Sequence, residues 1–268
     1  MIGCNLLGDG GAPFAATRTP LPPAATITAS PGPTATELSE WETLMPGLEM
    51  LTTQMPAPGV GSTTAVLVRI DPQLFTFRVH YTPYQTTTMA GWLSRIDAPV
   101  IVNGGFFLGN GQTNGLLVAD GQRFGTTFDR HGGMLTLMGD MMNVRSLAQF
   151  PYSRTELLDQ AAQGRPMLLY PGGFPVVMGD IEHEAGRRTA IAQDKQGRIL
   201  LVVIDEGAAT LDRLRDWLAY ERPDLELSTA FNLDGGTSTG LSIKTERRNL
   251  LLDSRGRLPI VIAFYPRP

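Results

Sequence analysis

The sequence contains few of the residues from which disulfide frameworks, zinc sites and membrane spans are built. Cys4 is the only cysteine among 268 residues, and none of the three histidines has the spacing of a zinc motif. No apolar run approaches the roughly 18 residues that a transmembrane helix needs. The net charge is -4 and no basic stretch occurs, which argues against a nucleic-acid partner. We therefore expect no cofactor and no metal site, although the composition leaves a divalent metal open.

The first 40 residues differ in composition from the remainder of the chain. Cys4 ends the stretch "MIGC", which resembles the end of a bacterial lipobox, and residues 10–36 are rich in Pro, Thr, Ala and Gly without hydrophobic periodicity. We expect residues 1–40 to be a lipidation site and a disordered linker, and residues 41–268 to be one globular domain. The protein is then extracytoplasmic and contacts a membrane only through a lipid on Cys4.

This division predicts two separable results. Replacing Cys4 with serine should move the protein from the membrane fraction to the soluble fraction of the host cell, because the lipid would be its only anchor. Deleting residues 1–36 should leave the thermal midpoint unchanged, because that stretch contains no core-forming pattern. A membrane-bound Cys4→Ser protein, or a clearly lower midpoint after the deletion, would contradict the respective part.

From Trp41 onward the pattern is that of an α+β domain with a mostly antiparallel or mixed sheet and a few short helices. Residues 64–70 and 74–80 alternate between apolar and polar side chains around Asp71-Pro72, which predicts a β-hairpin. Residues 211–221 carry leucines at helical spacing after Thr210, a good N-cap, and predict the clearest helix.

Two strand-like segments end in the same way. "VIVNGGFF" leads into Asn103, Gly104 and Gly105, and "FNLDGGTS" leads into Asp234 and two further glycines. Glycines after a strand let a ligand approach the backbone, and consecutive turn amides can bind an anion. For either segment alone an ordinary turn is the simpler interpretation. If the two strand ends lie side by side, they form one candidate site.

Other residues complete the candidate site. Arg188 precedes a predicted strand and could bind phosphate with its planar guanidinium, and Asp205 or Glu206 could supply a second carboxylate. The amides and hydroxyls that could contact substrate belong to Gly104, Gly105, Gly235, Gly236, Thr237 and Ser238.

Six blocks in order resemble the phosphodiester glycosidase family. They are "NGGFF" at 103, "NGLLVADGQ" at 114, "GRPMLLYPGG" at 164, "RRTAIAQDKQGRILLVVID" at 187, "NLDGGTSTGL" at 232 and "LPIVIAFYP" at 258. The resemblance implies hydrolysis of a sugar-1-phosphodiester to a sugar and a phosphomonoester. It points to Asn103, Gly104, Arg188, Asp234 and Gly235. One departure is that Thr237, Ser238 and Thr239 stand where the family usually has a glycine and two serines.

These observations lead to a hypothesis for the reaction. Asp234 is the expected nucleophile or general base, and Arg188 with the glycine amides is expected to hold the phosphodiester. A phosphate leaving group needs less protonation than an alkoxide, so one carboxylate could suffice where glycosidases typically use two. Two alternatives remain: a non-catalytic cell-surface module that binds phosphorylated glycans, and a metal-dependent phosphodiesterase.

Overall fold

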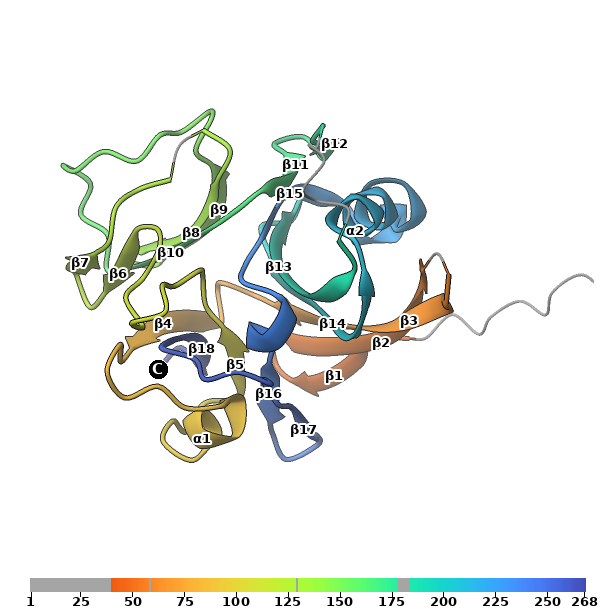
Figure 1. Cartoon of the computed structure of the whole chain (residues 1–268), viewed down its shortest axis with the longest axis horizontal. Helices are drawn as coiled ribbons and strands as arrows, with labels where there is room; N and C mark the ends of the chain where they lie inside the picture. The colour runs from red at the N-terminus through yellow and green to blue at the C-terminus, as the bar shows by residue number, and fades with distance from the viewer. Residues whose placement is uncertain (1–39, 58, 129, 178–183) are drawn as a thin grey trace, which may run out of the picture. The chain divides into compact units, whose positions relative to one another are not determined.

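The computed structural model describes residues 40–268, with the exception of residues 58, 129 and 178–183. They fold into three antiparallel sheets with a few short helical segments (Figure 1). The prediction of a mostly antiparallel sheet is confirmed. Helical segments make up a smaller part of the described residues than is usual for an α+β domain. Cys4 and His183 lie outside the described residues, as does most of the expected linker.

The largest sheet has eight strands in the order β1-β2-β3-β14-β13-β15-β11-β12. Two candidate residues belong to its central part: Arg188 lies in β13, and Asp234 follows the end of β15. These two strands are hydrogen-bonded neighbours. The strands of this sheet are β1 (Glu42–Met45), β2 (Leu48–Ala57), β3 (Gly61–Ile70), β11 (Met167–Tyr170), β12 (Phe174–Pro175), β13 (Gly186–Asp194), β14 (Ile199–Ala209) and β15 (Leu227–Asn232).

Two five-stranded sheets complete the fold. The first has the order β7-β6-β10-β8-β9 and consists of β6 (Leu117–Ala119), β7 (Gln122–Phe124), β8 (Gly133–Met138), β9 (Met141–Ser146) and β10 (Gln160–Gly164). The second has the order β17-β16-β5-β18-β4 and consists of β4 (Phe75–Tyr81), β5 (Val100–Asn103), β16 (Leu241–Lys244), β17 (Asn249–Leu252) and β18 (Ile260–Pro266).

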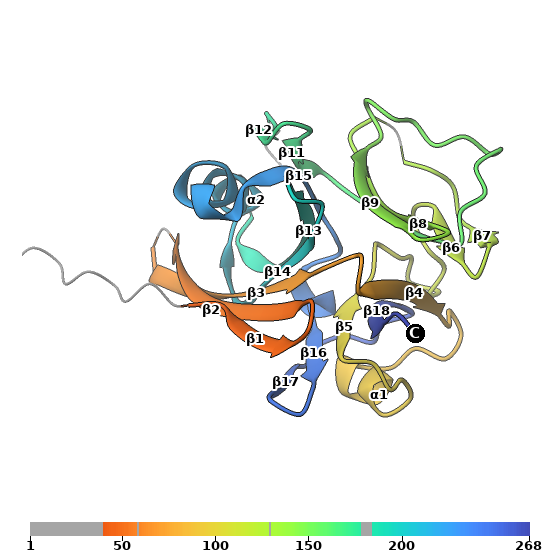
Figure 2. The same ribbon diagram turned by 180° about the vertical axis from the view of Figure 1, so that it is seen from behind.

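The helical segments are short. They are α1 (Met89–Leu93), α2 (Leu211–Asp216), the π-helical turn η2 (Trp217–Glu221) and the 3₁₀ turns η3 (Pro223–Leu225) and η4 (Gly236–Ser238). The views from the front and from behind place α2 against the sheet of β13 and β14, and α1 beside β5 and β16 (Figures 1 and 2). The helix predicted at residues 211–221 is confirmed as α2 continued by η2, and the Thr210 hydroxyl accepts a hydrogen bond from the amide of Arg213 at 3.1 Å.

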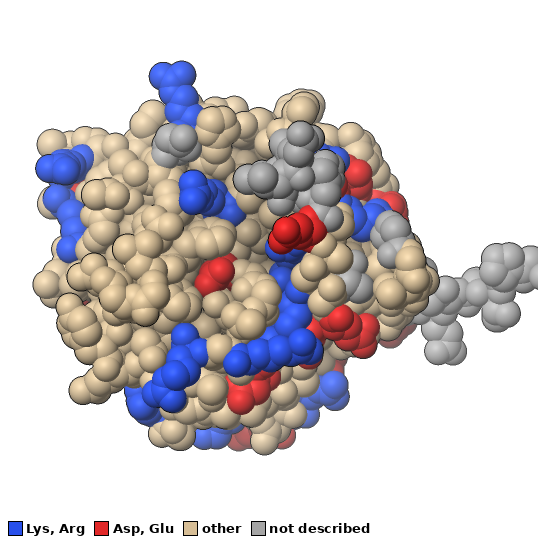
Figure 3. All heavy atoms as spheres, in the orientation of Figure 1, with Lys and Arg blue, Asp and Glu red and all other residues tan. Residues whose placement is uncertain are grey.

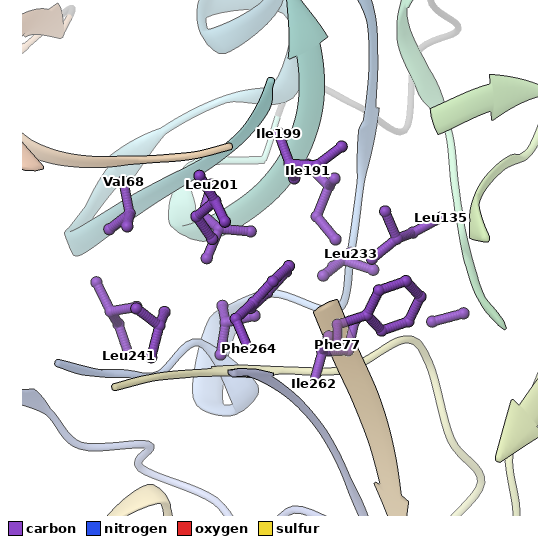
Figure 4. Packing of buried hydrophobic residues seen from close by; sticks show 14 of the residues in the cluster. Val68, Phe77, Leu135, Ile191, Ile199, Leu201, Leu233, Leu241, Ile262 and Phe264 are labelled. Carbon is purple, nitrogen blue, oxygen red and sulfur yellow. The ribbon is translucent and has the colours of Figure 1, made fainter. Parts of the chain in front are cut away.

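One hydrophobic core is shared by all three sheets. Figure 4 shows Leu201 and Ile191 of the large sheet facing Phe264 and Ile262 of β18, with Leu135 of β8 closing one side. The opposite face of the large sheet is covered by α2 and η2, whose Leu214 and Trp217 are buried. Because both faces of β14 are buried, its apolar run is continuous instead of alternating, as the sequence "ILLVVI" shows.

The predicted hairpin around Asp71-Pro72 is wrong. Both segments are strands, but β3 pairs with β2 and β14, whereas β4 pairs with β18 in another sheet. Between them the Asp71 carboxylate accepts a hydrogen bond from the amide of Gln73, and its carbonyl accepts one from the amide of Phe75. This tight corner sends β4 into the second layer, where both strands bury apolar side chains in the shared core.

Candidate functional site

The two strand ends that carry Gly-Gly meet in the structure. Asn103 is the last residue of β5, and Asp234 follows β15 two residues beyond its end, so they come from different sheets. The side-chain amide of Asn103 donates a hydrogen bond to the backbone carbonyl of Asp234, with 2.8 Å between nitrogen and oxygen. The expectation that these loops lie side by side is confirmed, although 131 positions separate them.

Asn103 uses all of its hydrogen-bonding capacity inside the protein. Its side chain is fully buried, and its Nδ2 also donates to the carbonyl of Gly104 at 3.2 Å. Its Oδ1 accepts from the Thr189 hydroxyl at 2.7 Å and from the amide of Gly240 at 3.1 Å. Two donors and two acceptor positions are therefore occupied. The residue joins β5, β13 and both ends of the loop that contains Asp234.

Asp234 has the electrostatic environment of an acid–base group. Its side chain is half-buried at the end of β15, and this burial raises the pKa of the carboxyl. The Ser238 side chain and the amide of Gly235, which lies 3.0 Å from Oδ1, lower the pKa by a smaller amount. No described lysine or arginine forms an ion pair with it. A carboxyl with a raised pKa can take up and release a proton nearer to neutral pH.

Arg188 lies opposite Asp234 across two neighbouring strands. Ala190 of β13 pairs with Asn232 of β15, and the strands run antiparallel. Continuing this register by two residues places the backbone of Arg188 opposite that of Asp234, although neither charge is among the causes that shift the pKa of the other group. The pairing extends this far, because the amide of Leu233 donates to the carbonyl of Thr189 at 2.8 Å.

The guanidinium of Arg188 is held by two backbone carbonyls, and no other described residue bonds its remaining N–H groups. Its Nε donates to the carbonyl of Ala209 at 2.9 Å, and Nη2 donates to the carbonyl of Glu184. Its Nη1 lies 3.7 Å from the position that a Cβ on Gly235 would occupy. Burial lowers the pKa of Arg188, and the charge of Glu184 raises it by less. Arginine stays protonated in proteins, so it presents a fixed cation next to the Gly235 backbone.

The two candidate second carboxylates are bonded to other residues. Asp205 forms an ion pair with Arg187, whose side chain is 4% exposed. The Glu206 carboxylate accepts hydrogen bonds from the Thr63 hydroxyl and from the amide and hydroxyl of Thr64. Because β14 lies between β3 and β13, these bonds direct Glu206 away from the strand that carries Arg188. No described contact joins either carboxylate to Asp234.

The glycines of the two loops serve different purposes. A Cβ on Gly104 would stand 2.3 Å from a methyl carbon of Ile260, and one on Gly105 would stand 2.3 Å from the carbonyl oxygen of Gln163. Both glycines are therefore required by close packing between strands.

The two glycines after Asp234 differ: a Cβ on Gly235 would stand 2.9 Å from the carbonyl oxygen of Arg187, whereas Gly236 is not confined. Gly236 has a φ of +59°, which favours glycine, and nothing lies within 4 Å of the position of an added Cβ. The following Thr237 is exposed, whereas Ser238 is 5% exposed. Open space beside this turn is compatible with a ligand that lies along the backbone.

Two further arginines near the site could not be recognised from the sequence. Arg187 was passed over for its neighbour Arg188, and nothing in the sequence tells which of the pair is buried. Arg165 stacks its guanidinium 4.9 Å from the centre of the Phe128 ring, and its carbonyl accepts a hydrogen bond from Asn232 at 3.0 Å. Arg165 lies in the block "GRPMLLYPGG", but its contact with Phe128 joins residues 37 positions apart and has no signal in the sequence.

Other features of the described residues lie apart from this site. Within residues 40–268, gaps aside, no three His, Cys, Asp or Glu side chains gather as a metal site would require. No described helix is long and apolar enough to cross a membrane. Cavities of about 840 and 510 Å³ are lined by residues such as Met45 and Lys244, and Met141 and Arg267, and contain none of the predicted site residues.

Solved structures with a similar fold come from bacteria and a vertebrate. The catalytic domain of zebrafish N-acetylglucosamine-1-phosphodiester α-N-acetylglucosaminidase superposes with a TM-score of 0.63 at 16% identity, covering 86% of this chain and 87% of that one. A hypothetical protein from Synechocystis gives 0.60 at 16% identity, covering 85% of this chain and 64% of that one. A candidate exported protein from Burkholderia pseudomallei K96243 gives 0.58 at 14% identity, with coverages of 79% and 75%. The chain thus spans under two thirds of the Synechocystis protein.

No curated protein matches the chain in a sequence search. The profile of the phosphodiester glycosidase family matches residues 97–265, which include both Gly-Gly loops and all of β13 to β15. This match covers more than half of the sequence and agrees with the order of the motifs. The chain therefore belongs to the phosphodiester glycosidase family.

Proposed function

We propose that this protein hydrolyses the glycosidic bond of a sugar-1-phosphodiester on an extracellular glycan or polymer. The oxygen of water bonds to C1 of the sugar, the bond between C1 and the phosphate oxygen breaks, and the phosphate leaves as a phosphomonoester. The protons of the water end on the free sugar and on the solvent or the leaving phosphate.

The observation that carries this proposal is the half-buried carboxyl of Asp234, whose pKa is raised at a strand end facing Arg188. Glycosyl transfer passes through a positively charged, oxocarbenium-like centre, which a carboxylate stabilises. Asp234 acts as the nucleophile or as the base that deprotonates water. The engagement of Asp205 and Glu206 with other partners supports a reaction that uses one carboxylate, since phosphate leaves with little protonation.

The neighbouring groups take separate roles in this proposal. The N–H groups of Arg188 and the amide of Gly236 hold the phosphodiester, with the hydroxyl of Thr237 at the edge. The amide of Gly235 and the side chain of Ser238 hold the carboxyl of Asp234 instead. Asn103 acts through its hydrogen bond to the carbonyl of Asp234 and does not touch substrate. Gly104 and Gly105 contribute by allowing the strands to pack.

The test of the proposed function is a product assay. Purified protein is incubated with a small panel of sugar-1-phosphodiesters, with and without EDTA, and both free sugar and phosphomonoester are measured. Equal amounts of the two products that depend on the protein are expected. Release of an alcohol together with sugar-1-phosphate would identify cleavage of the other phosphate ester bond, and loss of activity with EDTA would favour a metal-dependent phosphodiesterase.

Replacing Arg188 with alanine is expected to lower kcat/KM by about 10–100-fold, with much of the loss in KM. A hydrogen bond to a charged group contributes about 1.5–3 kcal/mol, and the phosphate is bound in both ground and transition states. The matched control is Arg198→Ala, which removes an arginine paired with Asp194 at the opposite end of the β13–β14 hairpin. Equal kinetics for wild type and Arg188→Ala would contradict the assignment.

An extracytoplasmic location is part of the same proposal. The similar fold of a candidate exported protein supports it, and the lipobox-like "MIGC" supplies the means of attachment. The fractionation of wild type and Cys4→Ser described above tests it.

A further inference from the structure

We propose that Arg165 forms a second anion subsite on the other side of Asp234 from Arg188, so that the preferred substrate carries a second phosphate group beside the scissile phosphodiester. This inference rests on the proposed function, because it names the class of substrate that the same site selects. Its occupant is a phosphate on the unit adjacent to the hydrolysed bond, as a polymer of sugar phosphates provides.

Arg165 is fixed next to the strand that leads to Asp234. The amide of Asn232 donates to the carbonyl of Pro166 at 2.9 Å, and the side-chain amide of Asn232 donates to the carbonyl of Arg165 at 3.0 Å. In the large sheet β15 lies between β13, which carries Arg188, and β11, which begins directly after Pro166. The chain at Arg165, just before β11, and β13 with Arg188 therefore flank the strand that leads to Asp234.

The guanidinium of Arg165 is held by stacking and leaves its N–H groups free. Its centre lies 4.9 Å from the middle of the half-buried Phe128 ring, and Phe106 packs edge-on against Phe128 at 6.3 Å. Phe106 belongs to the loop that begins at Asn103, so this aromatic pair borders the site. Stacking uses the flat face of the guanidinium and leaves its rim available for a planar contact with phosphate.

Among the described residues, none neutralises the charge of Arg165. The residue is exposed, and no described side chain or carbonyl accepts a hydrogen bond from its guanidinium. Arg222 stacks similarly on Trp217, at 5.4 Å, but also forms an ion pair with Asp224. The chain as a whole carries a net charge of -4. An unpaired cation at this border therefore creates a local positive potential that attracts an anion.

The surface agrees with a site flanked by cations. Figure 3 shows basic side chains around the part of the face where Figure 1 draws the end of β15, with acidic side chains among them. A substrate with a single phosphate could engage one side only. A substrate with two phosphates could engage Arg188 and Arg165 together, with the scissile bond at Asp234.

The test compares two synthetic probes by titration calorimetry at low salt. One is a sugar-1-phosphodiester with a neutral alkyl group, and the other has the same group ending in a phosphomonoester. We expect wild type to bind the second probe about tenfold more tightly, in line with one added charge-assisted hydrogen bond. In Arg165→Gln the ratio of the two affinities should fall to about one, whereas Arg165→Lys, which keeps the charge, should retain part of the preference.

The matched control is Arg222→Gln, which also removes a stacked arginine and one positive charge; its affinity ratio should equal that of wild type. Equal binding of both probes by wild type, or an undiminished ratio in Arg165→Gln, would overturn the subsite. Turnover of the neutral probe is measured in parallel. Turnover without a preference for the second phosphate would refute the subsite alone. A preference that depends on Arg165, without turnover of either probe, would support the subsite and refute the hydrolase.

Discussion

Replacing Asp234 with asparagine is expected to reduce hydrolysis of a sugar-1-phosphodiester by about 10²–10⁴-fold, the usual effect of losing one acid–base group. Asparagine has nearly the same shape, and it keeps the backbone carbonyl that accepts the hydrogen bond from Asn103. It removes the negative charge and the basicity of the carboxyl. The fall should appear in kcat, because the charge acts on the transition state more than on the bound substrate.

The control for this substitution is Asp97→Asn, which changes the charge by the same amount. Asp97 is 96% exposed and pairs with Lys244, away from the site, so its replacement should leave kcat unchanged. Circular dichroism and the thermal midpoint establish that both variants fold. A folded Asp234→Asn protein with wild-type turnover would end the catalytic assignment. If wild type shows no turnover and Asp234→Asn binds an anionic glycan at least as tightly, the protein is a binding module.

The pH dependence provides a second measurement on Asp234. Because burial raises the pKa of this carboxyl, the acid limb of kcat/KM should lie above the ordinary value of about 3.9 for aspartate. A nucleophile or base must be ionised, so activity should rise with pH through this limb. An acid limb at or below the ordinary value would contradict the environment that the structure gives to the carboxyl.

The same pKa shift has an effect of the opposite sign on stability. The folded-state pKa lies above the unfolded value, so the ionised carboxylate destabilises the fold at pH values above the folded-state pKa. This destabilisation disappears as the pH falls through that pKa. Asp234→Asn removes the charge at every pH, so at neutral pH the variant should be at least as stable as wild type. Such a gain in stability with a loss of activity is typical of a catalytic group kept in an unfavourable environment.

Local patterns predicted much of the fold, and long-range pairing explains the errors. The helix at residues 211–221 could be identified because its N-cap and apolar stripe are encoded within a dozen residues. The strands at residues 64–70 and 74–80 were equally clear, but β4 pairs with β18, more than 100 positions away, and β3 pairs both with the preceding β2 and with the distant β14. A tight turn between alternating segments is compatible both with a hairpin and with a corner between sheets. Only the packing of both strands into the shared core decides between them.

The candidate site could also be predicted only in part. Asp234 and the paired Gly-Gly loops could be singled out from the sequence, because two strand-like segments end in the same Asn/Asp-Gly-Gly pattern within an ordered set of family-like motifs. The role of each residue could not be identified, because it depends on partners distant in sequence. Asn103 looked like a polar group available to substrate, and its four hydrogen bonds to other parts of the protein are visible only in three dimensions. Likewise, Asp205 forms an ion pair with Arg187, whereas no described side chain forms an ion pair with Arg165. The sequence reveals neither fact.

Replacing Asn103 with alanine is expected to lower the free energy of unfolding by about 3 kcal/mol. A hydrogen bond contributes about 0.5–1.5 kcal/mol, and a buried group left without a partner costs about 1–3 kcal/mol. The variant would leave the Thr189 hydroxyl, the amide of Gly240 and the carbonyl of Asp234 without their bonds to this side chain. For a domain of this size the loss corresponds to a fall in Tm of roughly 10 °C.

The matched control is Asn143→Ala, since Asn143 also lies in a strand, β9, but its side chain is exposed. That variant should keep the wild-type Tm within about 1 °C, because surface substitutions change stability by about 0.5 kcal/mol or less. Activity distinguishes a positioning role from direct contact with substrate. If Asn103 positions Asp234, Asn103→Ala should lose kcat together with its lowered Tm, and the acid limb of its pH profile should move as the Asp234 loop loosens. A variant with an unchanged Tm and pH profile but a raised KM would instead assign Asn103 to substrate binding.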